Sequence, residues 1–202
     1  MPSDSPPQAP RVSPVSIPNL LTYARIVAVP AVVASFYIPG KAGPITALAF
    51  FVAAAITDFF DGYLARAWGQ QSALGRMLDP IADKLLVAAA LLVLLAEGTI
   101  GDWSLWAALI ILSREILVSG LRESLATVQV SVPVSRLAKW KTTVQMVAIA
   151  FLLVAPPEPE NEIISFASEV GLTLLWIAAV ITLYTGYDYF RAGFRHLLRQ
   201  DS

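Results

Sequence analysis

The 202-residue sequence contains no cysteine, a single histidine and few charged residues. The absence of cysteine excludes a disulfide scaffold and cysteine-ligated zinc. A lone histidine, His196, excludes a metal site built from several histidines. Charged residues make up 14% of the chain, whereas an ordinary soluble domain contains about 25%. The formal net charge of −1 argues against a nucleic-acid-binding protein, which usually carries a large basic excess.

Hydrophobic residues are abundant instead. They form 56% of the chain, and the mean hydropathy is +0.66. A soluble domain is roughly 45–50% apolar, and a disordered chain is polar and rich in charge. The composition therefore predicts an integral membrane protein. Residues 1–17 are the exception, because they are polar and hold five of the 14 prolines; we expect them to form a flexible cytoplasmic tail.

Six long apolar segments follow this tail. A spanning helix needs about 20 residues to cross a hydrocarbon core of about 30 Å. The segments are Leu20–Ile38, Gly43–Arg66, Leu78–Ala96, Trp103–Ala126, Leu137–Ala155 and Ile163–Phe190. They predict an all-α membrane protein with six transmembrane helices in one domain over residues 18–195, followed by a short C-terminal tail at 196–202.

The basic residues predict the orientation of these helices. In a six-span arrangement, 13 of the 14 lysines and arginines lie on one side of the membrane, with Lys41 as the exception. The connections on the opposite side carry acidic residues such as Glu97 and Asp102. Because cytoplasmic loops carry an excess of lysine and arginine, we expect both termini to lie in the cytoplasm.

Four aspartates lie at the cytoplasmic ends of the second and third segments. Asp58 and Asp61 are three residues apart, so they share one face of a helix. Asp79 and Asp83 are four apart and share a face of the next helix. A short connection through residues 69–75 would bring the two faces together.

Four ionised carboxylates at one place would be unstable without cations. Each costs about 2.5–3.5 kcal/mol at membrane depth on insertion scales, and the four would repel one another. Arg66 and Lys84 cannot neutralise all of them. Oxygen-only ligation, without cysteine or histidine nearby, indicates Mg²⁺, Mn²⁺ or Ca²⁺. Two carboxylate pairs could hold two ions, which suits phosphoryl chemistry.

Small residues accompany the aspartates. Gly62, Ala65 and Gly75 remove side-chain bulk and allow close approach of a ligand or another backbone. Arg66 is placed to meet a phosphate. The alternative is small-residue helix packing, with Asp–Arg pairs holding the helix ends. That alternative would suit an isolated aspartate pair, whereas four aspartates with two glycines and an arginine favour a ligand site.

The pattern D-x2-D-G-x2-A-R-x8-G-x3-D-x3-D resembles the signature of the CDP-alcohol phosphatidyltransferase family. All eight fixed positions match, namely Asp58, Asp61, Gly62, Ala65, Arg66, Gly75, Asp79 and Asp83. The resemblance implies a homodimeric six-helix enzyme of the bacterial inner membrane, with its active site open to the cytoplasm. It implies that an alcohol attacks a CMP-activated lipid and releases CMP.

The resemblance also implies roles for these residues. The four aspartates would bind Mg²⁺ or Mn²⁺, two ions per active site, and Asp83 would also act as the base that takes the acceptor's hydroxyl proton. The residues expected to lie against the CDP part are Gly62, Ala65, Arg66 and Gly75.

Three further stretches, at residues 17–25, 114–123 and 139–146, are similar to the branch of the family whose acceptor is sn-glycerol 3-phosphate. That branch transfers a phosphatidyl group from CDP-diacylglycerol and yields phosphatidylglycerophosphate and CMP. A dianionic acceptor needs cations near the metals, and the candidates on the correct side are Arg25, Arg114, Arg122, Lys139 and Lys141.

Alternative interpretations stay open at this point. The same cations could touch lipid headgroups, with Glu115 pairing with Arg122, and Arg25 could extend along the helix toward the membrane surface. The acceptor could belong to a sister reaction, such as that of a cardiolipin synthase or an inositol-phosphate enzyme. A divalent-cation transporter is a more distant alternative, because the outer halves of the segments are almost wholly apolar and offer no polar route.

Overall fold

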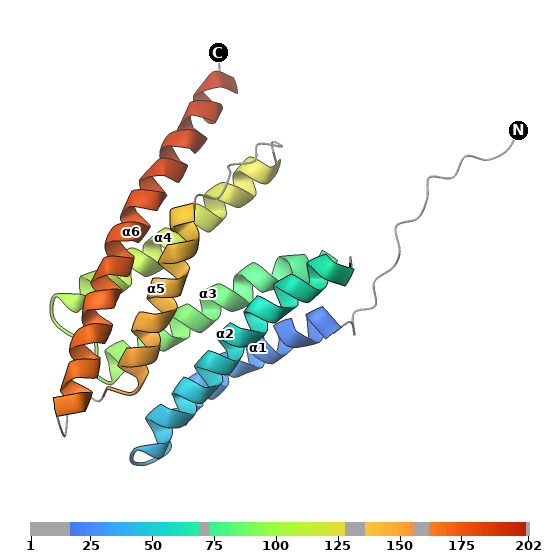
Figure 1. The fold of residues 1–202 in the computed structure, drawn as a ribbon. Helices are drawn as coiled ribbons and strands as arrows, with labels where there is room; N and C mark the ends of the chain where they lie inside the picture. Colours follow the sequence, from blue (N-terminus) through green and yellow to red (C-terminus); the bar gives the residue numbers. More distant parts are fainter. Residues whose placement is uncertain (1–16, 69–72, 128–135, 156–161, 201–202) are drawn as a thin grey trace, which may run out of the picture.

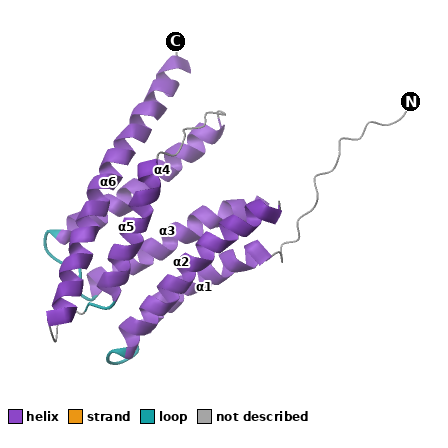
Figure 2. Ribbon diagram, in the orientation of Figure 1, coloured by secondary structure: helices purple, strands orange, loops and turns teal. Residues whose placement is uncertain are grey.

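The computed structural model describes residues 17–68, 73–127, 136–155 and 162–200, and this part of the chain is helical apart from short turns (Figure 2). The helices are α1 Ile17–Ser35, α2 Ala42–Trp68, α3 Ala73–Ala96, α4 Ser104–Thr127, α5 Arg136–Leu153 and α6 Glu162–Gln200. The prediction of an all-α protein is confirmed for the described residues. The N-terminal tail expected at residues 1–17 lies outside them, except for Ile17.

The helix boundaries differ most from the predicted apolar segments at the start of α3 and the end of α6. Helix α3 begins at Ala73 instead of Leu78, and α6 continues to Gln200 instead of ending at Phe190. The backbone of residues 196–200, where we expected a separate tail, is therefore the last part of α6.

Successive helices run in alternating directions along the bundle (Figure 1). Helix α1 packs against α2 and α3, and α6 packs against α4 and α5. Helix α5 also contacts α2 and α3, so it joins the two groups. The starts of α1, α3 and α5 consequently lie at the same end of the bundle as the final residues of α2, α4 and α6. We call this the aspartate end, because Asp58, Asp79 and Asp83 all lie on the helices toward it.

The core between the helices is built from aliphatic side chains. Fully buried examples are Leu86 and Leu94 of α3, Ile111 of α4, Ile149 of α5 and Leu175 of α6. In a lipid environment, close van der Waals packing of such side chains, and not their removal from water, favours the association of the helices.

Helices α5 and α6 approach closely at Gly171. A Cβ atom there would lie 2.8 Å from the side chain of Leu152. The absence of a side chain at this position therefore sets the spacing between the two helices, and with it the placement of the α6 residues nearer the aspartate end.

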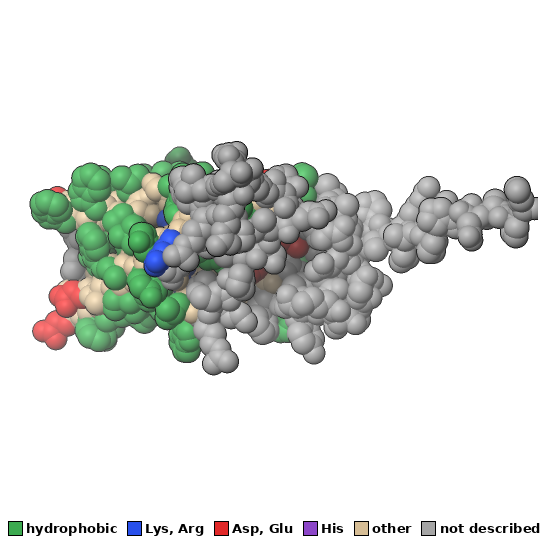
Figure 3. All heavy atoms as spheres, turned by 90° about the horizontal axis from the view of Figure 1, so that it is seen from above, with side chains coloured by type: hydrophobic (Ala, Val, Ile, Leu, Met, Phe, Trp, Pro, Cys, Tyr) green, Lys and Arg blue, Asp and Glu red, His purple; other side chains and the backbone are tan. Residues whose placement is uncertain are grey.

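The outer surface of the bundle is apolar. Large exposed side chains include Val27, Leu92, Ile116, Phe166 and Val180. Viewed along the helices, hydrophobic side chains make up most of the visible perimeter of the described part (Figure 3). Water-soluble monomers rarely expose contiguous apolar patches larger than a few hundred Å², so this surface suits a lipid environment.

Within the described residues, two helices are long and apolar enough to cross a membrane, over Ser104–Leu125 and Glu162–Arg191. Only 22% of the most apolar window in each is buried inside the protein, unlike the core helix of a soluble domain. Shorter apolar stretches occupy Asn19–Ser35, Ala42–Asp58 and Trp140–Leu153.

Candidate active site

Helix α1 connects the aspartates of α2 and α3. The Arg25 Nη1 atom lies 2.7 Å from Asp58 Oδ1, and the Thr22 hydroxyl donates a hydrogen bond of 2.5 Å to Asp79 Oδ1. Thr22 and Arg25 are both buried, and because they are three residues apart they share one face of α1. One face of α1 thus orients a carboxylate on each of the next two helices.

The aspartates act on one another electrostatically. The negative charges of Asp79 and Asp83 both affect the Asp58 carboxylate. Asp79 and Asp83 are partly buried in the first half of α3, and Asp58 lies in the second half of α2. The structure therefore brings three of the four predicted aspartates to one place. Asp61 belongs to α2, but its side chain lies outside the described residues.

The other residues of the predicted signature are only partly described. Gly75 is buried near the start of α3. The side chains of Ala65 and Arg66 and the surroundings of Gly62 lie outside the described part of α2. The predicted contacts of this set with the CDP group stay predictions.

The carboxylate oxygens of these aspartates are suitable ligands for a hard divalent cation such as Mg²⁺. Asp58 and Asp79 each engage one carboxylate oxygen with Arg25 or Thr22, as carboxylates that ligate metals commonly do. Within the described residues, no three acidic or histidine side chains form a complete metal-binding group. The predicted set also includes Asp61, whose side chain lies outside the described residues.

A second group of polar side chains lies where α4, α5 and α6 meet. The Lys141 ammonium of α5 forms an ion pair with the Glu115 carboxylate of α4. The neighbouring Arg114 donates a hydrogen bond of 3.1 Å to the Thr185 hydroxyl of α6, and its guanidinium carbon lies 5.9 Å from the centre of the Tyr189 ring. Glu115 therefore pairs with a neighbouring helix, and not with Arg122 as one of the sequence interpretations had it.

Helix α6 approaches Arg114 closely enough to restrict it. A Cβ atom at Gly186 would lie 3.2 Å from Arg114 Cγ, so a larger residue there would displace the arginine. The Thr185 hydroxyl itself donates to the Ile181 carbonyl at 2.9 Å. Its position is thus determined by the backbone of α6, which makes it a rigid acceptor for the guanidinium.

The cation group lies within electrostatic reach of the aspartates. The negative charge of Asp83 acts on both Lys141 and Lys84, and the charge of Arg114 acts on Lys141. Two predicted acceptor cations, Arg114 and Lys141, are thereby brought to the side of the site that holds Asp83.

The remaining predicted acceptor cations are placed differently. Arg122 is exposed near the end of α4, and its charge acts on Lys84. Arg25 is buried against Asp58, so it does not extend toward the membrane surface. The side chain of Lys139 lies outside the described residues.

Some residues that contact the candidate site were not predicted as site residues from the sequence. Thr22, Glu115, Thr185 and Tyr189 all touch a predicted site residue. The spacing of Thr22 and Arg25 would have placed them on one face, but the partner helices could not be inferred from that spacing.

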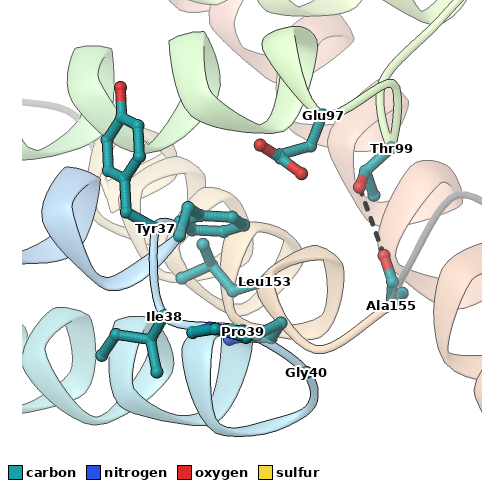
Figure 4. Close-up of a pocket in the computed structure, with 10 residues that line it drawn as sticks. Tyr37, Ile38, Pro39, Gly40, Glu97, Thr99, Leu153 and Ala155 are labelled. Atoms are coloured by element: carbon teal, nitrogen blue, oxygen red, sulfur yellow. Dashed lines mark hydrogen bonds between the residues drawn. The ribbon is translucent and has the colours of Figure 1, made fainter.

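A pocket of about 260 Å³ lies at the opposite end of the bundle (Figure 4). It is lined by the α1–α2 turn, by Glu97 and Thr99 after α3, and by Leu153 and Ala155 at the end of α5. The Thr99 hydroxyl donates to the Ala155 carbonyl at 3.3 Å across its wall. Its lining contains no basic residue and one carboxylate, so it lacks the groups that phosphate chemistry needs.

Comparison with known proteins agrees with the chemistry of the aspartate end. Residues 15–184 match the family described as CDP-alcohol phosphatidyltransferase. A CDP-diacylglycerol–glycerol-3-phosphate 3-phosphatidyltransferase from Rickettsia bellii is 48% identical over 177 residues, covering 88% of this chain and 94% of the relative. Proteins of the same name from Cereibacter sphaeroides and Shigella flexneri are 41% and 43% identical, covering 90% and 92% of this chain and 97% and 98% of the relatives. The chain belongs to the CDP-alcohol phosphatidyltransferase family.

Proposed function

We propose that the chain transfers a phosphatidyl group from CDP-diacylglycerol to sn-glycerol 3-phosphate, giving phosphatidylglycerophosphate and CMP. The observation that carries this is the pair of neighbouring cations where α4, α5 and α6 meet. Lys141 is buried and lies within electrostatic reach of Asp83, and the partly buried Arg114 lies close enough to act on Lys141. A dianionic acceptor needs such cations. The names of the relatives specify the same acceptor.

Each residue of the site has a separate role in this reaction. Arg114 and Lys141 hold the acceptor phosphate and direct the 1-hydroxyl toward Asp83. Asp83 takes the hydroxyl proton as a general base. The hydroxyl oxygen then forms a bond to the phosphorus that carries the diacylglycerol, and the bond from that phosphorus to the CMP oxygen breaks. Gly62, Ala65, Arg66 and Gly75 receive the CDP portion.

The metal requirement is part of the same proposal. Asp58, Asp61, Asp79 and Asp83 would hold one or two Mg²⁺ or Mn²⁺ ions. When bound, such ions offset negative charge on the diphosphate and on the leaving CMP. The hydrogen bond from Thr22 and the ion pair with Arg25 support this assignment, because both fix a carboxylate in one orientation.

The acceptor is tested with purified, full-length protein in mixed micelles of detergent and CDP-diacylglycerol. We expect CMP release with sn-glycerol 3-phosphate, and at least a hundredfold less with phosphatidylglycerol, inositol phosphate or serine at equal concentration. Release of CMP with one of those alcohols but not with glycerol 3-phosphate would assign the chain to a sister reaction. Metal uptake by proteoliposomes without CMP release from any acceptor would support the transporter alternative.

We also propose six membrane spans, with both termini and the aspartate end on the cytoplasmic side of the bacterial inner membrane. The alternating helix directions, the apolar perimeter and the basic residues near one end support this arrangement.

The orientation can be tested by cysteine labelling. Because the chain has no cysteine, single cysteines can replace Asp102 and Glu123. In intact spheroplasts, an impermeant maleimide should label only the cysteine at 102. Labelling of both, or of 123 alone, refutes the orientation. The homodimer implied by the family resemblance stays a prediction.

A further inference from the structure

Two consecutive residues of α4, Arg114 and Glu115, contact two different helices. Successive side chains on an α-helix point about 100° apart. Arg114 therefore meets Thr185 on α6, while Glu115 meets Lys141 on α5. The Arg114 Nη1 atom still lies 4.0 Å from Glu115 Oε1. The carboxylate of Glu115 thus lies between the two cations that we assign to the acceptor phosphate.

Lys141 depends on this carboxylate. Its side chain is only 4% exposed, and that of Glu115 is 18% exposed. A buried ammonium without a counter-charge is strongly disfavoured, and a neutral amine would bind a dianionic phosphate poorly. A lysine side chain also has a flexible four-carbon stem. The ion pair with Glu115 therefore favours the charged form of Lys141 and restricts where its ammonium lies.

The position of the ammonium matters because Asp83 is within its electrostatic reach. If Lys141 moves, the bound acceptor phosphate moves with it, and the 1-hydroxyl is no longer presented to Asp83 in the same way. Glu115 itself is negative, so it is unsuited to direct contact with the acceptor phosphate and must act through a cation.

We propose that Glu115 is a positioning residue for the acceptor: it holds Lys141 of α5 in place, and thereby aligns the acceptor phosphate relative to Asp83. This inference rests on the proposed function. Glu115 does not belong to the aspartate signature. Its carboxylate is negative, whereas the Lys141 ammonium that binds the phosphate is positive.

The test is the Glu115→Gln variant, which keeps the shape of the side chain and removes its charge. With full-length enzyme in mixed micelles, we expect the KM for sn-glycerol 3-phosphate to rise at least tenfold, while the KM for CDP-diacylglycerol changes less than twofold. Glu123→Gln is the matched control, because Glu123 is an exposed glutamate on the same helix; its KM values should equal those of the wild type.

A double-mutant cycle separates positioning from a general structural role. In a Lys141→Met background, where the ammonium is absent, adding Glu115→Gln should change the KM for sn-glycerol 3-phosphate less than twofold further. An undiminished tenfold effect in that background, or an equal rise in the KM for CDP-diacylglycerol, would overturn the proposal.

Two further measurements keep the outcome decisive. If Glu115→Gln does not fold, Glu115→Asp retains the charge on a shorter side chain and should raise the KM for glycerol 3-phosphate by a smaller factor, with kcat near that of the wild type. An unchanged KM for glycerol 3-phosphate in a folded Glu115→Gln refutes the role, and if that variant does not fold, an unchanged KM in Glu115→Asp refutes it. Failure of the proposed function would be seen separately, as a wild-type enzyme that releases no CMP with glycerol 3-phosphate.

Discussion

The Asp83→Asn variant should bind CDP-diacylglycerol largely as the wild type does and release CMP at less than a tenth of the wild-type rate. Asparagine has nearly the same shape as aspartate, but its amide cannot accept the hydroxyl proton. General base catalysis contributes about 10²–10⁴-fold in rate, so the loss should be large. The measurement is CMP release at saturating concentrations of both substrates, together with equilibrium binding of a CDP-lipid to the same preparation.

Asp83 is suited to this role by its neighbours. It is partly buried in α3, and its charge acts on Lys84 and Lys141. The matched control is Asp102→Asn, at an exposed position toward the opposite end of the bundle, which should leave the rate unchanged. If Asp83→Asn keeps more than a tenth of the activity, Asp83 is not the base. If it loses CDP-lipid binding and turnover in parallel, its contribution is to metal binding alone.

The helices could be predicted from the sequence because the apolar runs have the length of a membrane span. The start of α3 and the end of α6 could not be predicted in this way, because an apolar run indicates which residues lie in the hydrocarbon core and not where the helix begins or ends. Residues 73–77 include a glycine and an arginine, so their sequence favours a connection between two apolar segments. The last ten residues of α6 include three arginines and a histidine, but leucine, arginine and glutamine are good helix formers, and the helix continues through them to Gln200.

The candidate site was predictable where its residues share a helix face. The spacing of Asp79 and Asp83 placed them together within α3. Helices α2 and α3 contact each other as expected, and the charges of Asp79 and Asp83 act on Asp58. The spacing could not indicate partners on other helices. Arg66 and Lys84 were candidates to neutralise the aspartates because they are near them in the chain.

The structure supplies that neutralising charge from another helix. Arg25 of α1 pairs with Asp58, 33 residues further along the chain, and Lys84 donates a hydrogen bond of 2.8 Å to the Pro80 carbonyl of its own helix. The pairing of Lys141 with Glu115 likewise depends on α4 and α5 lying side by side at this point. Such contacts follow from packing, which a local pattern does not contain.

The Asp58→Ala variant should destabilise the fold more than Arg25→Met does. The Arg25 side chain is 0% exposed, whereas that of Asp58 is 48% exposed. Removing Asp58 leaves a buried guanidinium without its carboxylate, but removing Arg25 leaves a carboxylate that water can reach. Breaking a fully buried pair costs about 3–5 kcal/mol. Because this pair is half exposed, we expect Asp58→Ala to lower the free energy of unfolding by about 2 kcal/mol, in line with the smaller value of solvated pairs.

The measurement is the free energy of unfolding in detergent micelles without divalent metal, so that loss of a metal ligand does not contribute. The double variant Asp58→Ala with Arg25→Met should be more stable than Asp58→Ala alone, because it also removes the buried guanidinium that has lost the Asp58 carboxylate. Greater destabilisation by Arg25→Met than by Asp58→Ala would show that the other contacts of Arg25 outweigh the ion pair.

The same variants decide what Arg25 does during catalysis. As a ligand of the acceptor phosphate, it would raise the KM for glycerol 3-phosphate when replaced by methionine. As the partner that orients Asp58, it would instead change the concentration of Mg²⁺ or Mn²⁺ needed for half-maximal rate. A guanidinium with no exposed surface, 2.7 Å from a carboxylate of the predicted metal site, fits the second role. We therefore expect Arg25→Met to shift the metal dependence about tenfold, as removal of a hydrogen-bonding partner of a metal ligand typically does, while the KM for glycerol 3-phosphate stays within twofold of the wild-type value.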